Sequence, residues 1–229
     1  MNSWPHLGSE SATRIHRGCR LGVFGGTFDP VHIGYLIVAE EAYAHLSLDW
    51  VLFVPAHISP LKQGEGTFFT AAERWQMVEL AIADNPHFAA SRIELDREGP
   101  SYTIDTLRTL RSLLAPSALY FIMGADALHS LRAWRQPEEI LKLARLVAIS
   151  RPGHTPDLEA LDRDIPGLAE ATHIIETLMI GISSTDIRRR LRCGLPIKYQ
   201  VPASVEAFIY GCHSMRKLGL PARRPGLCV

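Results

Sequence analysis

Residues 21–34 read Leu21-Gly22-Val23-Phe24-Gly25-Gly26-Thr27-Phe28-Asp29-Pro30-Val31-His32-Ile33-Gly34. A short run that is apolar on both faces is typical of a strand in a covered parallel sheet. Two adjacent glycines let backbone amides approach a phosphate closely, and the N-terminus of a following helix adds unpaired N–H donors and partial positive charge. The stretch therefore predicts a strand, an anion-competent loop that starts at Gly25, and a helix that begins near His32. Taken alone, the glycine pair is also compatible with an ordinary tight turn.

The same alternation of apolar runs and helical patterns continues along the chain. Short apolar runs recur at residues 50–54, 119–123, 146–149 and 173–177, and helical periodicity covers 36–46, 70–82, 104–114, 137–144, 184–192 and 201–209. The second of these helices starts with Thr70-Ala71-Ala72-Glu73, a capping-box pattern. Strands alternating with helices predict an α/β fold with a doubly wound, mostly parallel sheet. In such sheets ligands bind beyond the carboxyl ends of the strands.

Length and composition bound the class of protein. The chain has 229 residues, of which 47% are apolar and 21% charged, as expected for a compact globular domain. We expect one main domain over residues 20–211, an N-terminal extension over 1–19 and a C-terminal tail over 212–229. The sequence leaves open whether the protein forms a homo-oligomer.

Charge and hydropathy argue against several partners. Lysines and arginines number 24, and so do aspartates and glutamates, so no global basic field would attract nucleic acid. No apolar stretch approaches the roughly 18 to 20 residues that cross a bilayer. The four cysteines show no Cys-x-x-Cys spacing and no paired histidine, which argues against a zinc knuckle or a redox dithiol. We assign no metal-ligating residues. These features predict a cytoplasmic protein without a nucleic-acid or membrane partner.

A second anion-binding pattern lies near the other end of the chain. Ile182-Ser183-Ser184-Thr185-Asp186-Ile187-Arg188 places three hydroxyls at the start of a helix and an arginine one turn in. Hydroxyls and backbone amides at a helix N-terminus form an anion site. An ordinary capped helix with solvated arginines would show the same local pattern. The first stretch fits neither the dinucleotide fingerprint Gly-x-Gly-x-x-Gly nor the P-loop pattern.

Together the two patterns resemble the signatures of the nucleotidylyltransferases related to class I aminoacyl-tRNA synthetases, which implies a Rossmann-like nucleotidylyltransferase fold for the main domain. That superfamily opens its first helix with His-x-Gly-His, which here reads His32-Ile33-Gly34-Tyr35. The second histidine is thus replaced by tyrosine. Either the phenol reaches the phosphates and substitutes in part, which we favour, or the ring packs and the positive charge comes from Lys62 or Arg188.

Segments in the middle of the chain resemble those of the bacterial nicotinate-nucleotide adenylyltransferases. The resemblance as a whole runs from about residue 20 to about residue 210. The segments that carry this resemblance are Ser101-Tyr102-Thr103-Ile104-Asp105-Thr106-Leu107, Gly124-Ala125-Asp126, Trp134 and Arg151-Pro152-Gly153. Pro60-Leu61-Lys62 stands where the family has Pro-His-Lys. The resemblance implies transfer of the adenylyl group of ATP to nicotinate mononucleotide, with Mg²⁺ accompanying ATP and pyrophosphate released.

The resemblance also implies a set of site residues. Catalytic roles fall to His32, Tyr35 and Arg188; ATP binding to Gly25, Gly26, Thr27, His32, Lys62, Asp126, Ser183, Ser184, Thr185 and Arg188; and pyridine-nucleotide binding to Thr103, Trp134 and Arg135. Local alternatives stay open for three of these residues. Trp134 is also compatible with a core position, Asp126 with a helix cap, and Thr103 with an ordinary first-turn position.

Two other functions stay open. The replacements at Tyr35 and Leu61 are compatible with a nucleotide-binding sensor or subunit that has weak catalysis. An enzyme that prefers nicotinamide mononucleotide would carry the same Ser-Tyr-Thr segment. Pyrophosphate release with each mononucleotide separates these functions.

Overall fold

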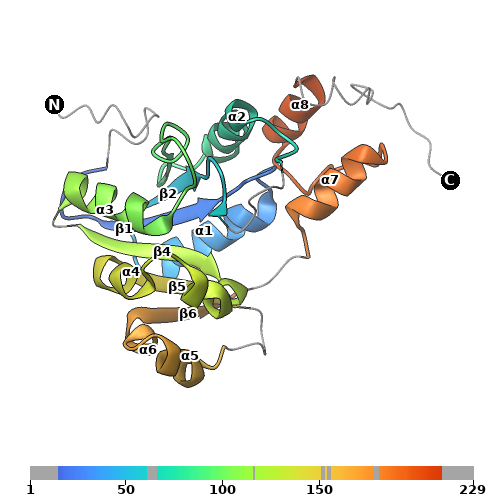
Figure 1. Ribbon diagram of the computed structural model, residues 1–229. Helices are drawn as coiled ribbons and strands as arrows, with labels where there is room; N and C mark the ends of the chain where they lie inside the picture. Colours follow the sequence, from blue (N-terminus) through green and yellow to red (C-terminus); the bar gives the residue numbers. More distant parts are fainter. Residues whose placement is uncertain are drawn as a thin grey trace.

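A six-stranded parallel sheet forms the centre of the molecule (Figure 1). The structure is a computed structural model and describes residues 15–60, 66–115, 117–150, 153, 156–177 and 181–212. The strand order is β3-β2-β1-β4-β5-β6, with bounds β1 Arg20–Gly26, β2 Trp50–Pro55, β3 Phe88–Ala90, β4 Ala118–Gly124, β5 Arg145–Ser150 and β6 Thr172–Glu176. β1 pairs with both β2 and β4, so the order reverses there. Such a reversal leaves a crevice at the carboxyl ends of the strands.

Helices cover both faces of this sheet. Their bounds are α1 Ile33–His45, α2 Ala71–Ile82, α3 Thr103–Leu114, the 3₁₀ helix η3 Ala125–Ala133, α4 Pro137–Leu143, α5 Leu158–Asp164, α6 Leu168–Ala171, α7 Ser184–Arg192 and α8 Ala203–Gly211. One core cluster joins the sheet to α1, α2, α7 and α8, and the other joins it to α3, η3, α4 and α6. Successive strand residues point to opposite faces, so both faces of each strand must be apolar.

The doubly wound parallel sheet predicted from the sequence is confirmed. All five predicted strands and all six predicted helices are present, and the capping box forms: the Glu73 amide donates to Thr70 Oγ1 at 3.2 Å, and the Thr70 amide donates to Glu73 Oε2 at 2.9 Å. The three-residue β3 and the short α5 and α6 were not predicted, because such elements contain too few residues to show a period.

The position of the glycine pair differs from the prediction. β1 extends through Gly26 and pairs Gly25 with Val54 and Gly26 with Pro55, so the loop begins at Thr27 and neither a loop nor a tight turn forms at the glycines. A Cβ added at Gly26 would lie 3.0 Å from the Phe28 ring. Gly26 is therefore explained by close packing within the strand end.

The segment before β1, part of the N-terminal extension expected from the sequence, packs against the main domain. Ile15 is 2% exposed and Cys19 is 1% exposed, and both lie in the cluster that contains α3. The amide of Gly18 donates to Ser117 Oγ at 3.0 Å. A single buried isoleucine produces no apolar periodicity, so sequence reading could not detect this contact.

No helix in the described part of the chain is long and apolar enough to cross a membrane.

We expect Ile15→Ala to lower the free energy of unfolding by about 2–5 kcal/mol, because it removes buried methyl groups and leaves a cavity. The measurement is urea denaturation followed by circular dichroism. His16→Ala is the matched control, since His16 is exposed, and it should change stability by no more than about 0.5 kcal/mol. Equal losses in the two variants would show that Ile15 is not a core residue.

Candidate functional site

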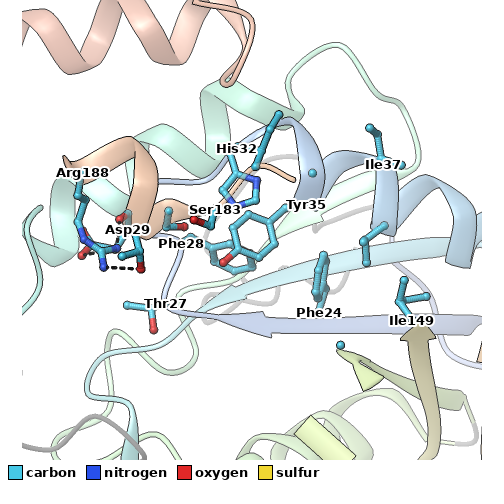
Figure 2. Close-up of a pocket in the computed structure, with 16 residues that line it drawn as sticks. Phe24, Thr27, Phe28, Asp29, His32, Tyr35, Ile37, Ile149, Ser183 and Arg188 are labelled. Carbon is cyan, nitrogen blue, oxygen red and sulfur yellow. Dashed lines mark hydrogen bonds and ion pairs between the residues drawn. The ribbon is translucent and has the colours of Figure 1, made fainter. Parts of the chain in front are cut away.

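A cleft of about 370 Å³ lies beyond the carboxyl ends of β1, β4 and β5, between the N-terminal parts of α1 and α7. That volume lies in the range of small-molecule sites. One part of its lining is apolar, with Phe24, Ile37 and Ile149, and Figure 2 shows that polar side chains gather at the other part. The polar lining residues are Thr27, Asp29, His32, Ser183, Ser184, Thr185 and Arg188. The cleft therefore suits a ligand with one apolar and one polar end.

The second sequence pattern docks directly on the first. Ser183 is the N-cap of α7, and its hydroxyl accepts a hydrogen bond from the Asp186 amide at 3.1 Å. The Ser184 hydroxyl donates to the carbonyl of Pro30 at 2.9 Å, although the two residues lie 154 positions apart. The N-terminus of α7, with its partial positive charge, is thereby held against the loop that follows β1.

Arg188 reaches into the cleft as a tethered side chain. Its Nη1 donates to the carbonyl of Asp29 at 2.7 Å and lies 3.7 Å from the Asp29 carboxylate, and its Nη2 donates to Thr185 Oγ1 at 3.2 Å. The side chain is 19% exposed. The alternative of a solvated helix arginine is therefore wrong for Arg188, whereas its neighbour Arg189 is exposed and pairs with Asp186.

Asp29 is a site residue that sequence reading missed. Its buried carboxylate accepts hydrogen bonds from the amides of Phe68 and Phe69, both at 2.9 Å. Behind it, the buried Arg74 donates through Nη1 to the carbonyl of Thr27 at 2.7 Å. The sequence signal was an acid between Phe28 and Pro30, but a local pattern does not show which charged residues are buried.

His32 is neutral in the cleft. Burial lowers the pKa of its imidazole to about 4, and no hydrogen-bond partner of its buried Nδ1 lies among the described residues. The ring stacks on that of Tyr35, with centroids 4.1 Å apart and an interplanar angle of 25°. His32 can therefore offer an N–H donor without a positive charge.

Tyr35 is held in an aromatic cluster. Its ring packs edge-on against Phe24 and Phe28, with centroid distances of 5.9 Å and 5.0 Å, and Figure 2 shows it beneath the ring of His32. Burial raises the pKa of the phenol, and the Ser184 hydroxyl and the Arg188 guanidinium oppose that rise. Of the two alternatives for Tyr35, the structure shows the packed ring. The phenol nevertheless lies close to Ser184, a residue expected to bind ATP.

The residues expected to bind the pyridine nucleotide form a separate group beside α3. Thr103 is the first residue of α3, and the Arg135 guanidinium lies 4.9 Å from the centroid of the Tyr102 ring and 3.4 Å from the Asp105 carboxylate. Trp134 is half-buried, and its Nε1 donates to Ser130 Oγ at 3.2 Å. None of the three predicted residues lines the cleft.

The remaining predicted residues are dispersed. Asp126 is exposed in η3, whose N-cap is Gly124 without a side-chain hydrogen bond, so the helix-cap alternative for Asp126 is wrong. Gly25 and Gly26 do not line the cleft. Lys62 lies outside the described residues, as do Leu61, Arg151 and Pro152.

Comparisons with known proteins agree on the family. The cytidylyltransferase-like family model matches residues 23–190. A probable nicotinate-nucleotide adenylyltransferase of Roseiflexus sp. (strain RS-1) is 49% identical over 189 residues, covering 82% of this chain and 94% of the relative. One from Desulfitobacterium hafniense (strain DSM 10664 / DCB-2) is 41% identical over 192 residues, covering 83% of this chain and 92% of the relative.

A similar fold occurs in a solved structure of Plasmodium falciparum nicotinic acid mononucleotide adenylyltransferase complexed with NaAD. It has a TM-score of 0.68 and 18% identity, and the match covers 86% of this chain and 96% of that one. At 18% identity this likeness shows the fold alone, whereas the relatives that are 41% and 49% identical show the family. The chain belongs to the cytidylyltransferase-like family and, within it, to the bacterial nicotinate-nucleotide adenylyltransferases.

Proposed function

We propose that this protein transfers the adenylyl group of ATP to nicotinate mononucleotide, giving nicotinate adenine dinucleotide and pyrophosphate, a step of NAD biosynthesis. The observation that carries this proposal is the meeting of the two motifs at one cleft, where Ser184 binds the carbonyl of Pro30 and Arg188 binds that of Asp29. Relatives that are 41% and 49% identical over most of the chain carry the name of this activity.

The polar part of the cleft is the proposed site for the triphosphate. The N-terminus of α7 offers backbone amides, that of Ser184 among them, while Ser183 and Thr185 offer hydroxyls. The Ser184 hydroxyl is bound to Pro30, and Arg188 offers a guanidinium whose tether keeps it in the cleft. His32 adds a neutral N–H donor. We propose from the family resemblance that Thr27 approaches the reacting phosphates, that Lys62 adds a positive charge and that Asp126 binds a ribose.

The reaction needs no nucleophile from the protein. The phosphate of the mononucleotide attacks the α-phosphate of ATP in line, a P–O bond forms, and the bond to the leaving pyrophosphate breaks. Catalysis is then positioning of the two substrates plus stabilisation of negative charge on the phosphoryl oxygens. In this reaction Arg188 and the α7 N-terminus stabilise charge, and the His32 N–H orients the triphosphate.

We propose that Mg²⁺ enters as part of the nucleotide substrate, with phosphate oxygens as its ligands. The carboxylate in the cleft, that of Asp29, already accepts two amide hydrogen bonds and lies next to Arg188. No group of three or more His, Cys, Asp or Glu side chains in the described ranges is placed to hold a metal. The hydrogen bonds that occupy the Asp29 carboxylate support a metal ion carried by ATP.

The mononucleotide is proposed to bind beside the start of α3, with Thr103 and the backbone of Arg135 as donors and Trp134 as a stacking surface. The Arg135 guanidinium lies over the ring of Tyr102, the residue before Thr103. Its charge is shared with the Asp105 carboxylate at 3.4 Å, so the choice between acid and amide rests on the names of the relatives. We therefore propose that nicotinate mononucleotide is preferred to nicotinamide mononucleotide.

The test is pyrophosphate release from ATP and Mg²⁺ with either mononucleotide, and with the mononucleotide omitted as control. We expect steady release with nicotinate mononucleotide and slower release with nicotinamide mononucleotide. Faster release with nicotinamide mononucleotide would show that this mononucleotide is the preferred substrate. Nucleotide binding without steady release would support the sensor or subunit, which the replaced histidine at Tyr35 leaves open.

We expect His32→Ala to lower kcat/KM for ATP by roughly 100-fold or more, because a preorganised donor to developing charge contributes about 3 kcal/mol. The readout is initial rates at pH 8 over a range of ATP concentrations. An unchanged rate would show that His32 takes no part in catalysis.

The same variant tests the protonation state of His32. Burial lowers the pKa of His32 from 6.5 to about 4, so as pH falls the histidine is protonated in the unfolded chain before it is protonated in the folded protein. The free energy of unfolding therefore decreases as pH falls from 6.5 towards 4. That loss amounts to about 3 kcal/mol in the unaltered protein. Urea denaturation of His32→Ala should show a smaller loss over this range, and an equal loss would contradict a neutral buried ring.

We expect Arg188→Lys to weaken ATP binding by about 1–3 kcal/mol, the range for a charged hydrogen bond. A guanidinium can bind Asp29 and Thr185 at once and still present an N–H to phosphate, which a single ammonium group cannot reproduce. Calorimetric titration with ATP and Mg²⁺ measures the change. Arg189→Lys is the matched control, and equal affinities of the two variants would show that Arg188 does not contact ATP.

We expect Tyr35→Phe to lower the rate about tenfold, or about 1.4 kcal/mol, because it removes the hydroxyl beside Ser184 while the stack on His32 remains. Steady-state kinetics and a thermal melt measure activity and fold. Tyr43→Phe is the control, since Tyr43 stacks on His87 away from the cleft lining. A Tyr35→Phe variant as fast as the parent would make the tyrosine purely a packing residue.

A further inference from the structure

Glu94 is a buried acid that lies outside the cleft lining and has no role in the mechanism described above. It lies in the turn between β3 and α3 and is 6% exposed. Its Oε1 accepts a hydrogen bond from Thr106 Oγ1 at 2.6 Å. Burying a carboxyl group costs free energy unless hydrogen bonds satisfy it. Moving a donor away from Glu94 would restore that cost, so the hydrogen bonds restrict the positions of the donors.

Ser101 connects this carboxylate to the loop after β2. The Ser101 amide donates to the carbonyl of Ile58 at 2.8 Å, and the Ser101 hydroxyl accepts from the amide of His57 at 2.9 Å. Burial raises the pKa of the Glu94 carboxyl, and hydrogen bonds from Thr106 and from the Ser101 hydroxyl oppose that rise. Ser101 therefore joins the β2 loop and Glu94 through one side chain.

Thr106 connects the same carboxylate to α3. It lies one turn into the helix, is buried, and accepts a hydrogen bond from Arg97 Nη2 at 3.1 Å as well as donating to Glu94. Glu94 thus holds Ser101 on one side and Thr106 on the other. Between them lie Tyr102 and Thr103, and the N-cap residue Tyr102 makes no side-chain hydrogen bond to the start of α3.

We propose that Glu94 is a positioning residue for the mononucleotide half of the site, holding residues 101–106 so that Thr103 and the α3 N-terminus face the pyridine nucleotide. Glu94 itself contacts neither substrate. The inference rests on the proposed function, because Thr103 is assigned to the pyridine nucleotide there. It predicts a larger effect on the mononucleotide site than on the ATP cleft, where Arg188 is tied directly to Asp29.

The test compares Glu94→Gln with Glu98→Gln, an exposed position in the same segment. KM is measured for nicotinate mononucleotide and for ATP, each with the other substrate saturating, together with kcat and a thermal melt. In Glu94→Gln we expect KM for the mononucleotide to rise by about fivefold or more, while KM for ATP stays within about twofold. Glu98→Gln should match the parent in all of these constants.

Equal increases of both KM values, or an unchanged KM for the mononucleotide, would overturn the inference. A merely structural role would lower the melting temperature or the active fraction without separating the two substrates. Failure of the parent protein to form the dinucleotide would instead overturn the proposed function, and the inference would fall with it.

Thr106→Val and Thr106→Ser provide a second test that does not depend on the folding of Glu94→Gln. Valine keeps the shape of threonine but removes the donor to Glu94, whereas serine keeps the hydroxyl. We expect Thr106→Val to raise KM for the mononucleotide selectively and Thr106→Ser to resemble the parent. Equal kinetics of these two variants would show that the hydrogen bond to Glu94 positions nothing.

Discussion

The buried carboxylate of Asp29 is the interaction on which the site depends. Two amides before α2 donate to it, and Arg188 of α7 binds its backbone carbonyl and lies near its charge. A buried charge that loses its partner costs about 3–5 kcal/mol, so these three segments are held together as a unit. The loop after β1, the start of α2 and the N-terminus of α7 therefore meet at one point, although they are far apart in the sequence.

Electrostatics of the cleft follow from this pairing. Among the described lining residues, the charge of Arg188 is balanced by that of Asp29, and burial keeps His32 neutral. The lining therefore carries little net positive charge to offset a triphosphate. Helix N-terminal amides, a cation that arrives with the nucleotide and the charge proposed for Lys62 then supply the compensation, in line with the proposal that Mg²⁺ accompanies ATP. The tyrosine at position 35 fits this pattern, since a phenol adds a donor without adding charge.

Much of the site could be predicted because its signals are local. The Ser183 cap and the position of Arg188 one turn into a helix can be read from adjacent residues, and the structure brings His32, Ser184 and Arg188 to one cleft. Asp29 and Glu94 could not be predicted as anchors, because their importance comes from burial and from partners in other segments. Likewise, sequence reading placed the glycine pair in a loop, while pairing with β2 extends the strand through it.

The sequence by itself determined the α/β class, the long helices and strands, the capping box at Thr70 and the two motifs, because periodicity and capping depend on neighbours within a few positions. Only the tertiary structure decided that β1 lies between β2 and β4, that Ile15 belongs to the core and that Arg188 is tied to Asp29. It also decided that His32 is neutral. Burial and electrostatics depend on which distant segments pack together, and no local pattern contains that information.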